Sequence, residues 1–89
     1  MPEKQNAEWK ETWKDEYLQW ICGFANAQGG KIYIGVDDLG NAVGLKNSKK
    51  LLEDLPNKIK DTMGIIADVN YHERNGKEYI EIVVPEYPQ

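Results

Sequence analysis

The chain has 89 residues, of which 40% are hydrophobic and 29% are charged, and its formal net charge is −4. This length fits one domain with a small core, and no apolar run reaches the ~18 residues of a membrane span, so no membrane contact is expected. The negative charge excludes a domain that coats nucleic acid by overall charge, so a nucleic-acid contact needs a local basic patch, a metal or other segments.

The first part of the chain predicts a strand, a helix and a second strand. Apolar and polar residues alternate over Asn6–Lys10, which predicts a short strand. Helical spacing runs over Lys14–Ala27 and ends at Gly29-Gly30, where glycine can adopt the left-handed conformation. Ile32, Ile34 and Val36 then alternate in a strand over Lys31–Val36. Gly35 inside this strand predicts close approach by a helix or another backbone.

The predicted helix carries two apolar stripes. The first follows core spacing and is expected to pack on the sheet: Leu18, Ile21, Cys22 and Ala25. The second is aromatic and lies beside it: Trp13, Tyr17, Trp20 and Phe24. One sheet face covers only the narrower stripe, so the aromatic stripe is predicted to be an interface, with a second copy of the domain or the rest of a longer protein. Trp13 and Trp20 should then be partly exposed in an isolated chain, and Cys22 should be packed.

A turn, a short strand and a second helix are predicted next. Turn residues fill positions 37–41, and positions 42–44 are expected to return as a short strand. The second helix begins near Ser48 as N-cap. Its core face follows helical spacing: Leu51, Leu52, Leu55, Ile59 and Met63. Pro56 lies inside this pattern and predicts a kink or a break into two helices.

The last two strands, over 65–73 and 78–84, flank Asn75-Gly76, a strong hairpin signal. A two-residue loop would place Arg74 opposite Lys77 and Glu73 opposite Glu78, which are like-charge pairs. A three-residue loop with Gly76 in a bulge would place Glu73 opposite Lys77, and we therefore expect the bulged register. The order β-α-β-(β)-α-β-β predicts a two-layer α/β sandwich, a mixed sheet with both helices on one face.

Two segments resemble a known family. The segment from Phe24 to Gly40, with Phe-Ala-Asn, Gly-Gly, an apolar strand and Gly-Val-Asp-Asp, resembles the signature of the Schlafen AlbA-like domain family, and Glu8-Trp9-Lys10-Glu11 resembles that family's Glu-Phe-Lys motif. The resemblance covers about Glu8 to Val84. It implies an Alba-like fold for residues 1–89 as a single domain, the N-terminal part of a longer protein. It also implies DNA binding within bacterial transcriptional regulators or RecG-like helicase-related proteins.

Basic residues carry the nucleic-acid-binding interpretation. Lys46, Lys49 and Lys50 lie between the turn and the second helix, and Lys10 and Lys14 lie near the start of the first. Lysines beside helix amides can bind phosphates, although the same residues would also suit a solvated surface. The function predicted from this pattern and the resemblance is a non-enzymatic nucleic-acid-binding domain of a regulatory protein, without a cofactor. A dimerisation or interaction module is a further alternative.

Acidic residues suggest a different class of function. Nuclease Schlafens hold a metal with three carboxylates, and the resemblance assigns Glu3, Glu8 and Asp37 or Asp38 to matching positions. Under this alternative the domain is a metal-dependent endoribonuclease that uses Mg²⁺ or Mn²⁺. With fifteen acidic residues in the chain, a solvated surface explains them more simply, and the sequence identifies no metal ligands beyond this set.

Cysteine and histidine contents bear on the compartment. Cys22 and His72 are the single cysteine and the single histidine, so neither an internal disulfide nor a structural zinc site is expected. This pattern suits a reducing environment, and we expect a cytoplasmic protein.

Overall fold

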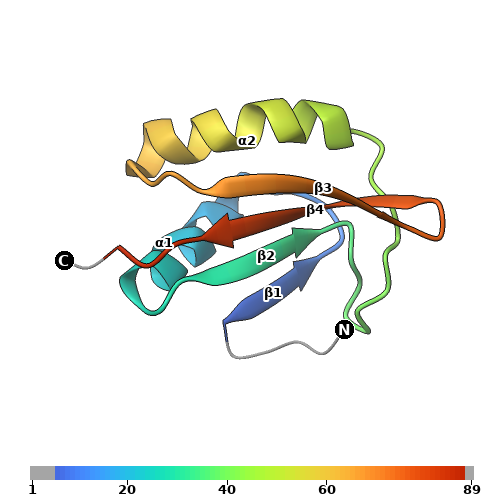
Figure 1. The fold of residues 1–89 in the computed structure, drawn as a ribbon, viewed down its shortest axis with the longest axis horizontal. Helices are drawn as coiled ribbons and strands as arrows, with labels where there is room; N and C mark the ends of the chain where they lie inside the picture. Colours follow the sequence, from blue (N-terminus) through green and yellow to red (C-terminus); the bar gives the residue numbers. More distant parts are fainter. Residues whose placement is uncertain (1–5, 88–89) are drawn as a thin grey trace.

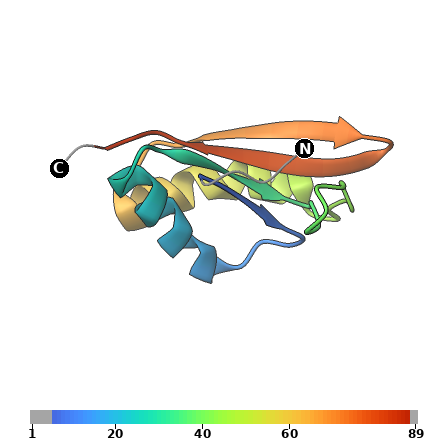
Figure 2. The same ribbon diagram turned by 90° about the horizontal axis from the view of Figure 1, so that it is seen from below.

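The computed structural model describes residues 6–87, and within them the chain folds into a mixed sheet covered by two helices (Figures 1 and 2). In chain order the elements are β1 (Ala7–Lys10), a 3₁₀ turn (Asp15–Tyr17), α1 (Leu18–Asn26), β2 (Gly30–Ile34), α2 (Ser48–Met63), β3 (Asp68–Arg74) and β4 (Lys77–Val84). Both helices lie on the same face of the sheet (Figure 2). The predicted two-layer α+β architecture is confirmed.

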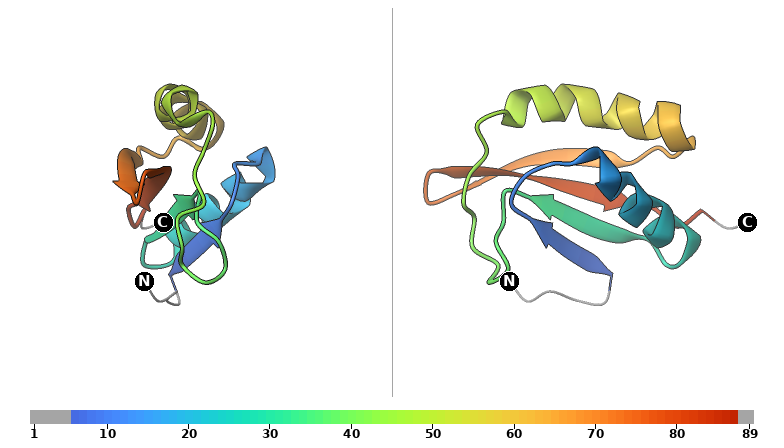
Figure 3. Two further views of the ribbon diagram at one scale, coloured as in Figure 1. Left: turned by 90° about the vertical axis from the view of Figure 1, so that its right-hand side faces the viewer. Right: turned by 180° about the vertical axis from the view of Figure 1, so that it is seen from behind.

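The sheet has the strand order β1-β2-β4-β3. β1 runs parallel to β2, with Trp9 opposite Tyr33, because α1 carries the chain back between them. β4 pairs antiparallel with β2 on one side and with β3 on the other. This arrangement leaves β1 and β3 at the two edges (Figure 3).

The main core lies between the helices and the sheet. Alternation brings every second residue of β2 and β4 to the helix side, where Ile32 and Ile34 meet Ile80 and Ile82. The helices contribute Ile21, Phe24 and Ala25 from α1, and Leu51, Leu55 and Ile59 from α2. Each large aliphatic side chain buried here contributes about 1.5–3 kcal/mol to folding. Across residues 6–87 neither helix has the length and apolar character needed to cross a membrane.

The buried face of α1 is rotated from the predicted one. Ile21 and Ala25 are buried as expected, but Cys22 is exposed and Phe24 is only 8% exposed. With two apolar stripes side by side, the sequence does not determine which side of α1 faces the sheet. The structure buries Phe24 rather than Cys22 because burying a phenyl ring removes more apolar area from water than burying a thiol. The predicted packing of Cys22 is therefore wrong, and so is the assignment of Phe24 to an external interface.

Glycines control both ends of β2. Gly29 has a φ of +80°, and its amide donates to the carbonyl of Phe24 at 2.7 Å, which ends α1 as predicted. At Gly35, an added Cβ would lie 2.9 Å from Leu45 Cγ and 3.1 Å from the Glu78 carbonyl oxygen, so the predicted close approach is confirmed. The regular strand ends at Ile34.

The predicted short strand over 42–44 is reduced to a single bridge. Val36 pairs with Ala42 in one antiparallel bridge outside the named strands, and no longer ladder forms between these segments. Val36 packs with Trp9 and Tyr79 in a small cluster on the face of the sheet away from the helices. The return of the chain was therefore predicted correctly, but its length as a strand was not.

α2 runs without interruption from Ser48 to Met63, so the predicted break at Pro56 is wrong. Proline removes one intrahelical hydrogen bond, but Leu55 and Ile59 on either side of that turn are almost fully buried and hold the helix against the sheet. The N-cap position is Asn47 rather than Ser48, which is the first helical residue.

The β3–β4 hairpin has a two-residue loop, and the predicted three-residue loop is wrong. Arg74 lies opposite Lys77 and Glu73 opposite Glu78. Asn75 and Gly76 both have positive φ, 52° and 75°, as a type I′ turn requires. The twist of this turn matches that of the strands, whereas like-charge pairs near an exposed tip cost only about 0.2–1 kcal/mol.

Candidate nucleic-acid interface

The start of α2 and the β3–β4 turn lie at the same end of the sheet (Figures 1 and 3). The segments at this end carry four exposed lysines. We call this set the basic end: Lys46, Lys49, Lys50 and Lys77. Lys46 lies in the loop before α2, Lys49 and Lys50 lie in its first turn, and Lys77 begins β4. Three separate segments thus supply one surface.

Two contacts hold these segments together. The Ser48 hydroxyl donates a hydrogen bond to Glu78 Oε1, which ties the first turn of α2 to β4. Ser48 is only 3% exposed, so this link is shielded from water. A Cβ at Gly44 would lie 3.4 Å from Lys77 Cδ, so the loop that leads to Lys46 packs against the Lys77 side chain. These contacts hold the start of α2, the loop before it and the start of β4 in one arrangement.

Among residues 6–87, the four lysines of the basic end make no ion pair that would neutralise them, although the Glu78 carboxylate, bonded to Ser48, lies at the same end. The first turn of α2 contains no acidic residue, and the Asn47 side chain makes no capping hydrogen bond. The amide groups at the start of a helix carry partial positive charge and point outward, so they add to the lysines as a site for anionic oxygens.

The other two predicted lysines lie elsewhere. Lys10 projects from β1, with its Nζ 5.1 Å from the ring centroid of Tyr17 and 5.7 Å from that of Trp20. It also lies 3.9 Å from Glu8 Oε2. Lys14 is exposed just before the 3₁₀ turn. The five predicted lysines thus form two groups. Lys46, Lys49 and Lys50 lie in the basic end with Lys77, whereas Lys10 and Lys14 lie near the start of α1.

The predicted carboxylates are engaged locally. Glu8 faces Lys10, and Asp37 Oδ1 accepts hydrogen bonds from the amides of Leu39 and Asn41, both at 2.9 Å. Asp38 is exposed in the same turn.

These positions bear directly on the metal-site alternative. Over residues 6–87, no three histidine, cysteine or acidic side chains are grouped so that they could hold a metal ion. Glu3 lies outside the described residues. The three-carboxylate site stays a prediction.

The aromatic stripe is only partly external. Trp20 is 41% exposed, and Trp13 is half-buried, with its Nε1 donating to Asp15 Oδ1 at 2.8 Å. Tyr17 meets the Trp13 ring edge-on, with centroids 5.9 Å apart. The partial exposure predicted for the two tryptophans is confirmed. A partner surface formed by Trp13, Tyr17 and Trp20 stays a prediction.

Sequence reasoning missed a polar network on the open face of the sheet. Glu81 lies at its centre and accepts hydrogen bonds from Tyr33 at 3.2 Å and Asn70 at 3.3 Å. His72 Nε2 lies 3.1 Å and Lys31 Nζ 3.4 Å from its carboxylate. Burial alone would raise the pKa of Glu81, but the hydrogen bonds from His72 and Asn70 and the charge of Lys31 lower that pKa overall. Alternation along one strand does not reveal such a network, because its members come from three strands.

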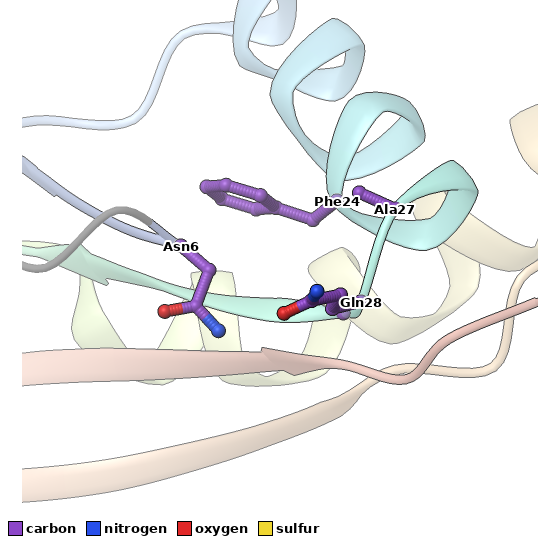
Figure 4. A pocket seen from close by; sticks show the side chains of 5 residues that line it. Asn6, Phe24, Ala27 and Gln28 are labelled. Atoms are coloured by element: carbon purple, nitrogen blue, oxygen red, sulfur yellow. The ribbon is translucent and has the colours of Figure 1, made fainter.

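A pocket of about 350 Å³ lies at the opposite end of the sheet (Figure 4). The side chains of Asn6 and Gln28 face each other near the ring of Phe24, and Ala27 and Gly29 complete the lining. The pocket lies where the start of β2 pairs with the end of β4. Lys77 lies at the other end of the same strand, at the start of β4. The pocket is thus separate from the basic end.

Comparisons with known proteins give a family and a fold. The sequence model described as Schlafen, AlbA_2 matches residues 3–89. A search of curated proteins found no match. The solution structure of the N-terminal domain of a RecG-related protein from Nitrosomonas europaea, named for an ATP-dependent DNA helicase, superposes with a TM-score of 0.76 at 24% identity. The crystal structure of the DIP2311 protein from Corynebacterium diphtheriae superposes with a TM-score of 0.62 at 19% identity.

These two neighbours are longer than the chain. The superposition with the N. europaea domain covers 97% of this chain and 66% of that one. The superposition with the C. diphtheriae protein covers 92% of this chain but only 18% of that one. The same fold is therefore found there as one part of a much larger polypeptide.

Proposed function

Because this chain belongs to the Schlafen AlbA_2 family, we propose that it is a nucleic-acid-binding domain that contacts phosphates through its basic end. The observation that carries the proposal is the convergence of Lys46, Lys49, Lys50 and Lys77, without ion pairs among the described residues, beside an uncapped helix start. This surface is local, since the chain as a whole has a net charge of −4. Electrostatics then favour one orientation of the domain on a polyanion.

Duplex DNA is the ligand that we propose, without a cofactor and without catalysis, in a cytoplasmic regulator or helicase-related protein of greater length. The name of the N. europaea neighbour, which refers to a DNA helicase, supports this choice. The basic end presents lysine ammonium groups and helix amides, and Arg74 lies beside it, opposite Lys77. Lysine ammonium groups and backbone amides bind phosphate oxygens and carry no sequence information by themselves. We therefore propose that this domain supplies affinity and position, while other parts of the full protein supply selectivity.

The mechanism makes a quantitative statement about salt. Each lysine that neutralises a phosphate of duplex DNA releases condensed counterions, which gives a slope of about −0.9 per contact in a log–log plot of affinity against salt. Four lysines set an upper bound of roughly −3.6 on the slope from this surface. The domain alone should thus bind weakly at physiological salt and tightly only in dilute buffer.

The test is a fluorescence-anisotropy titration of a labelled duplex at several salt concentrations. Lys49→Ala should weaken binding and flatten the slope by about 0.9. The matched control is Lys60→Ala, which removes the same charge from an exposed position more than two turns further along α2. Equal affinities and slopes for the two variants would contradict the proposed surface.

The same titration separates the alternatives of ligand and activity. Structured RNA in place of duplex DNA tests the choice of polynucleotide. Adding Mn²⁺ to the RNA arm tests the carboxylate site, because cleavage that Glu8→Gln abolishes would establish a nuclease and contradict the non-enzymatic proposal.

A further inference from the structure

β3 is an edge strand that pairs with β4 along its whole length. It is the last strand of the sheet, and five of its seven residues are exposed: Asp68, Asn70, Tyr71, Glu73 and Arg74. In the end-on view β3 (orange) lies at the margin of the molecule (Figure 3, left). The pairing with β4 is continuous from Asp68 opposite Val83 to Arg74 opposite Lys77, so no bulge interrupts it. β3 contains neither lysine nor proline, and its charged residues are of both signs: Asp68, Glu73 and Arg74.

The turn fixes which backbone groups of β3 point outward. In a two-residue hairpin the residues that flank the turn, Arg74 and Lys77, form a hydrogen-bonded pair. Alternation along an antiparallel ladder then directs the amides and carbonyls of every second residue of β3, from Asp68 to Arg74, toward β4. The backbone groups of Val69, Tyr71 and Glu73 consequently point away from the sheet.

We propose that two copies of this chain pair their β3 strands antiparallel about a two-fold axis at Tyr71, which joins the two sheets into one. In this register Tyr71 lies opposite its own copy, and Val69 lies opposite Glu73 of the second copy. All three outward-pointing residues then fall in hydrogen-bonded positions, which gives six backbone hydrogen bonds across the axis. If the two-fold axis lay at Asn70 or His72 instead, one of these three residues would have no hydrogen-bonded partner in the second β3 strand.

Charge complementarity selects the same register. Pairing centred on Tyr71 places Asp68 opposite Arg74 at both ends of the interface. Both residues are exposed, and neither forms an ion pair with another residue of the range 6–87. Opposite charges that face each other across paired strands stabilise the pairing, and a two-fold axis doubles the effect. This self-complementarity makes a second copy of the chain the partner of choice.

The proposed pairing uses the edge of β3 and none of the four lysines of the basic end, although Arg74 lies opposite Lys77. Because the β3 strands would run antiparallel, the two basic ends would lie at opposite ends of the joined sheet. The backbone contact is narrow, so the association belongs to the weak class of interfaces. We expect a dimer that forms in the micromolar to millimolar range and weakens with salt.

Sedimentation equilibrium at low salt tests the proposal by a charge swap. Asp68→Arg creates like charges at both ends and should weaken dimerisation at least five-fold. The double variant Asp68→Arg/Arg74→Asp restores opposite charges and should regain the wild-type dissociation constant. Asp61→Arg is the matched control, because it makes the same charge change at an exposed position on α2 and should have no effect. Circular dichroism verifies that each variant is folded.

Amide hydrogen exchange provides the second measurement. Protection of Val69, Tyr71 and Glu73 should rise with protein concentration, while that of Asn70 and His72 should stay constant. A wild-type chain that stays monomeric at 1 mM would overturn the proposal. So would a dimer that ignores the charge swap, or one that Trp20→Glu dissociates while the β3 amides show no concentration dependence.

Discussion

Replacing Gly29 by alanine should destabilise the domain more than the same replacement at Gly23 or Gly64. Gly29 has a φ of +80°, and an added Cβ would lie 2.6 Å from the Val84 carbonyl oxygen and 3.2 Å from the Glu86 amide nitrogen. Both neighbours are backbone atoms, one at the end of β4 and one just after it, so neither can rotate away. The substitution therefore combines an unfavourable backbone conformation with a forced displacement of β4.

The size of the effect can be bounded from these two control glycines. Gly64 ends α2 with a φ of +70° and has no atom within 4 Å of an added Cβ, so Gly64→Ala should cost only the conformational term of about 1–2 kcal/mol. Gly23 lies inside α1 with open space around it, so Gly23→Ala should stabilise the domain by roughly 0.5–1 kcal/mol. Gly29→Ala adds a steric overlap to the same conformational cost, and overpacking typically costs about 1–3 kcal/mol. We therefore expect this variant to lower the free energy of unfolding by about 3 kcal/mol or more.

Urea unfolding followed by circular dichroism measures all three variants on one scale. A domain of this size has a total stability on the order of 4–13 kcal/mol, so the Gly29→Ala variant should unfold at a clearly lower urea concentration. The order of stability should be Gly23→Ala, wild type, Gly64→Ala and Gly29→Ala. If Gly29→Ala costs no more than Gly64→Ala, the convergence of α1, β2 and β4 at this glycine is not as described.

Three further predictions follow from the side-chain contacts. The pKa of Glu81 is lowered in the folded state, so its contribution to stability is present above the unfolded pKa and is lost as pH falls through the folded pKa. Glu81→Gln should therefore be less stable than wild type at pH 7. A series of urea titrations should show this difference in stability closing below about pH 4.5. Ser48→Ala removes a buried hydrogen bond to Glu78 and should cost about 1.5–3 kcal/mol in the same assay, and an unchanged midpoint would contradict the link between α2 and β4. Cys22 is exposed, so a thiol reagent should label it fully in the native state, whereas labelling only upon unfolding would restore the core position that the spacing predicted.

The sequence predicts the existence and order of the elements well, because each depends on a local pattern. The structure confirms the helical stripe of Leu51, Leu55 and Ile59 and the roles of the glycines at 29 and 35. The strand bounds are less accurate, since β2 ends at Ile34 and β3 begins at Asp68. The errors arise where two local preferences compete. At Asn75-Gly76 the twist of a type I′ turn outweighs two like-charge pairs, and at Pro56 the burial of flanking residues outweighs one lost hydrogen bond.

The candidate site illustrates a different limit. Lys46, Lys49 and Lys50 were found from sequence because they are close along the chain. Lys77 was missed because its place beside them depends on the hairpin register and on the loop at Gly44, neither of which a single segment records. The Glu81 network was missed for the same reason, since it is assembled from residues of three strands. The rotation of α1 that buries Phe24 likewise depends on the sheet beneath it.

Amide chemical-shift mapping of the labelled domain, titrated with an unlabelled DNA duplex, tests the central claim most directly. The largest shifts are expected at the start of α2 and around the β3–β4 turn, at Lys46, Lys49, Lys50 and Lys77, and they should shrink as salt is added. Lys60 and the residues around the pocket at Gln28 should change little. Shifts centred on α1 or on the open face around Glu81, with the start of α2 unaffected, would contradict the assignment of the basic end as the nucleic-acid interface.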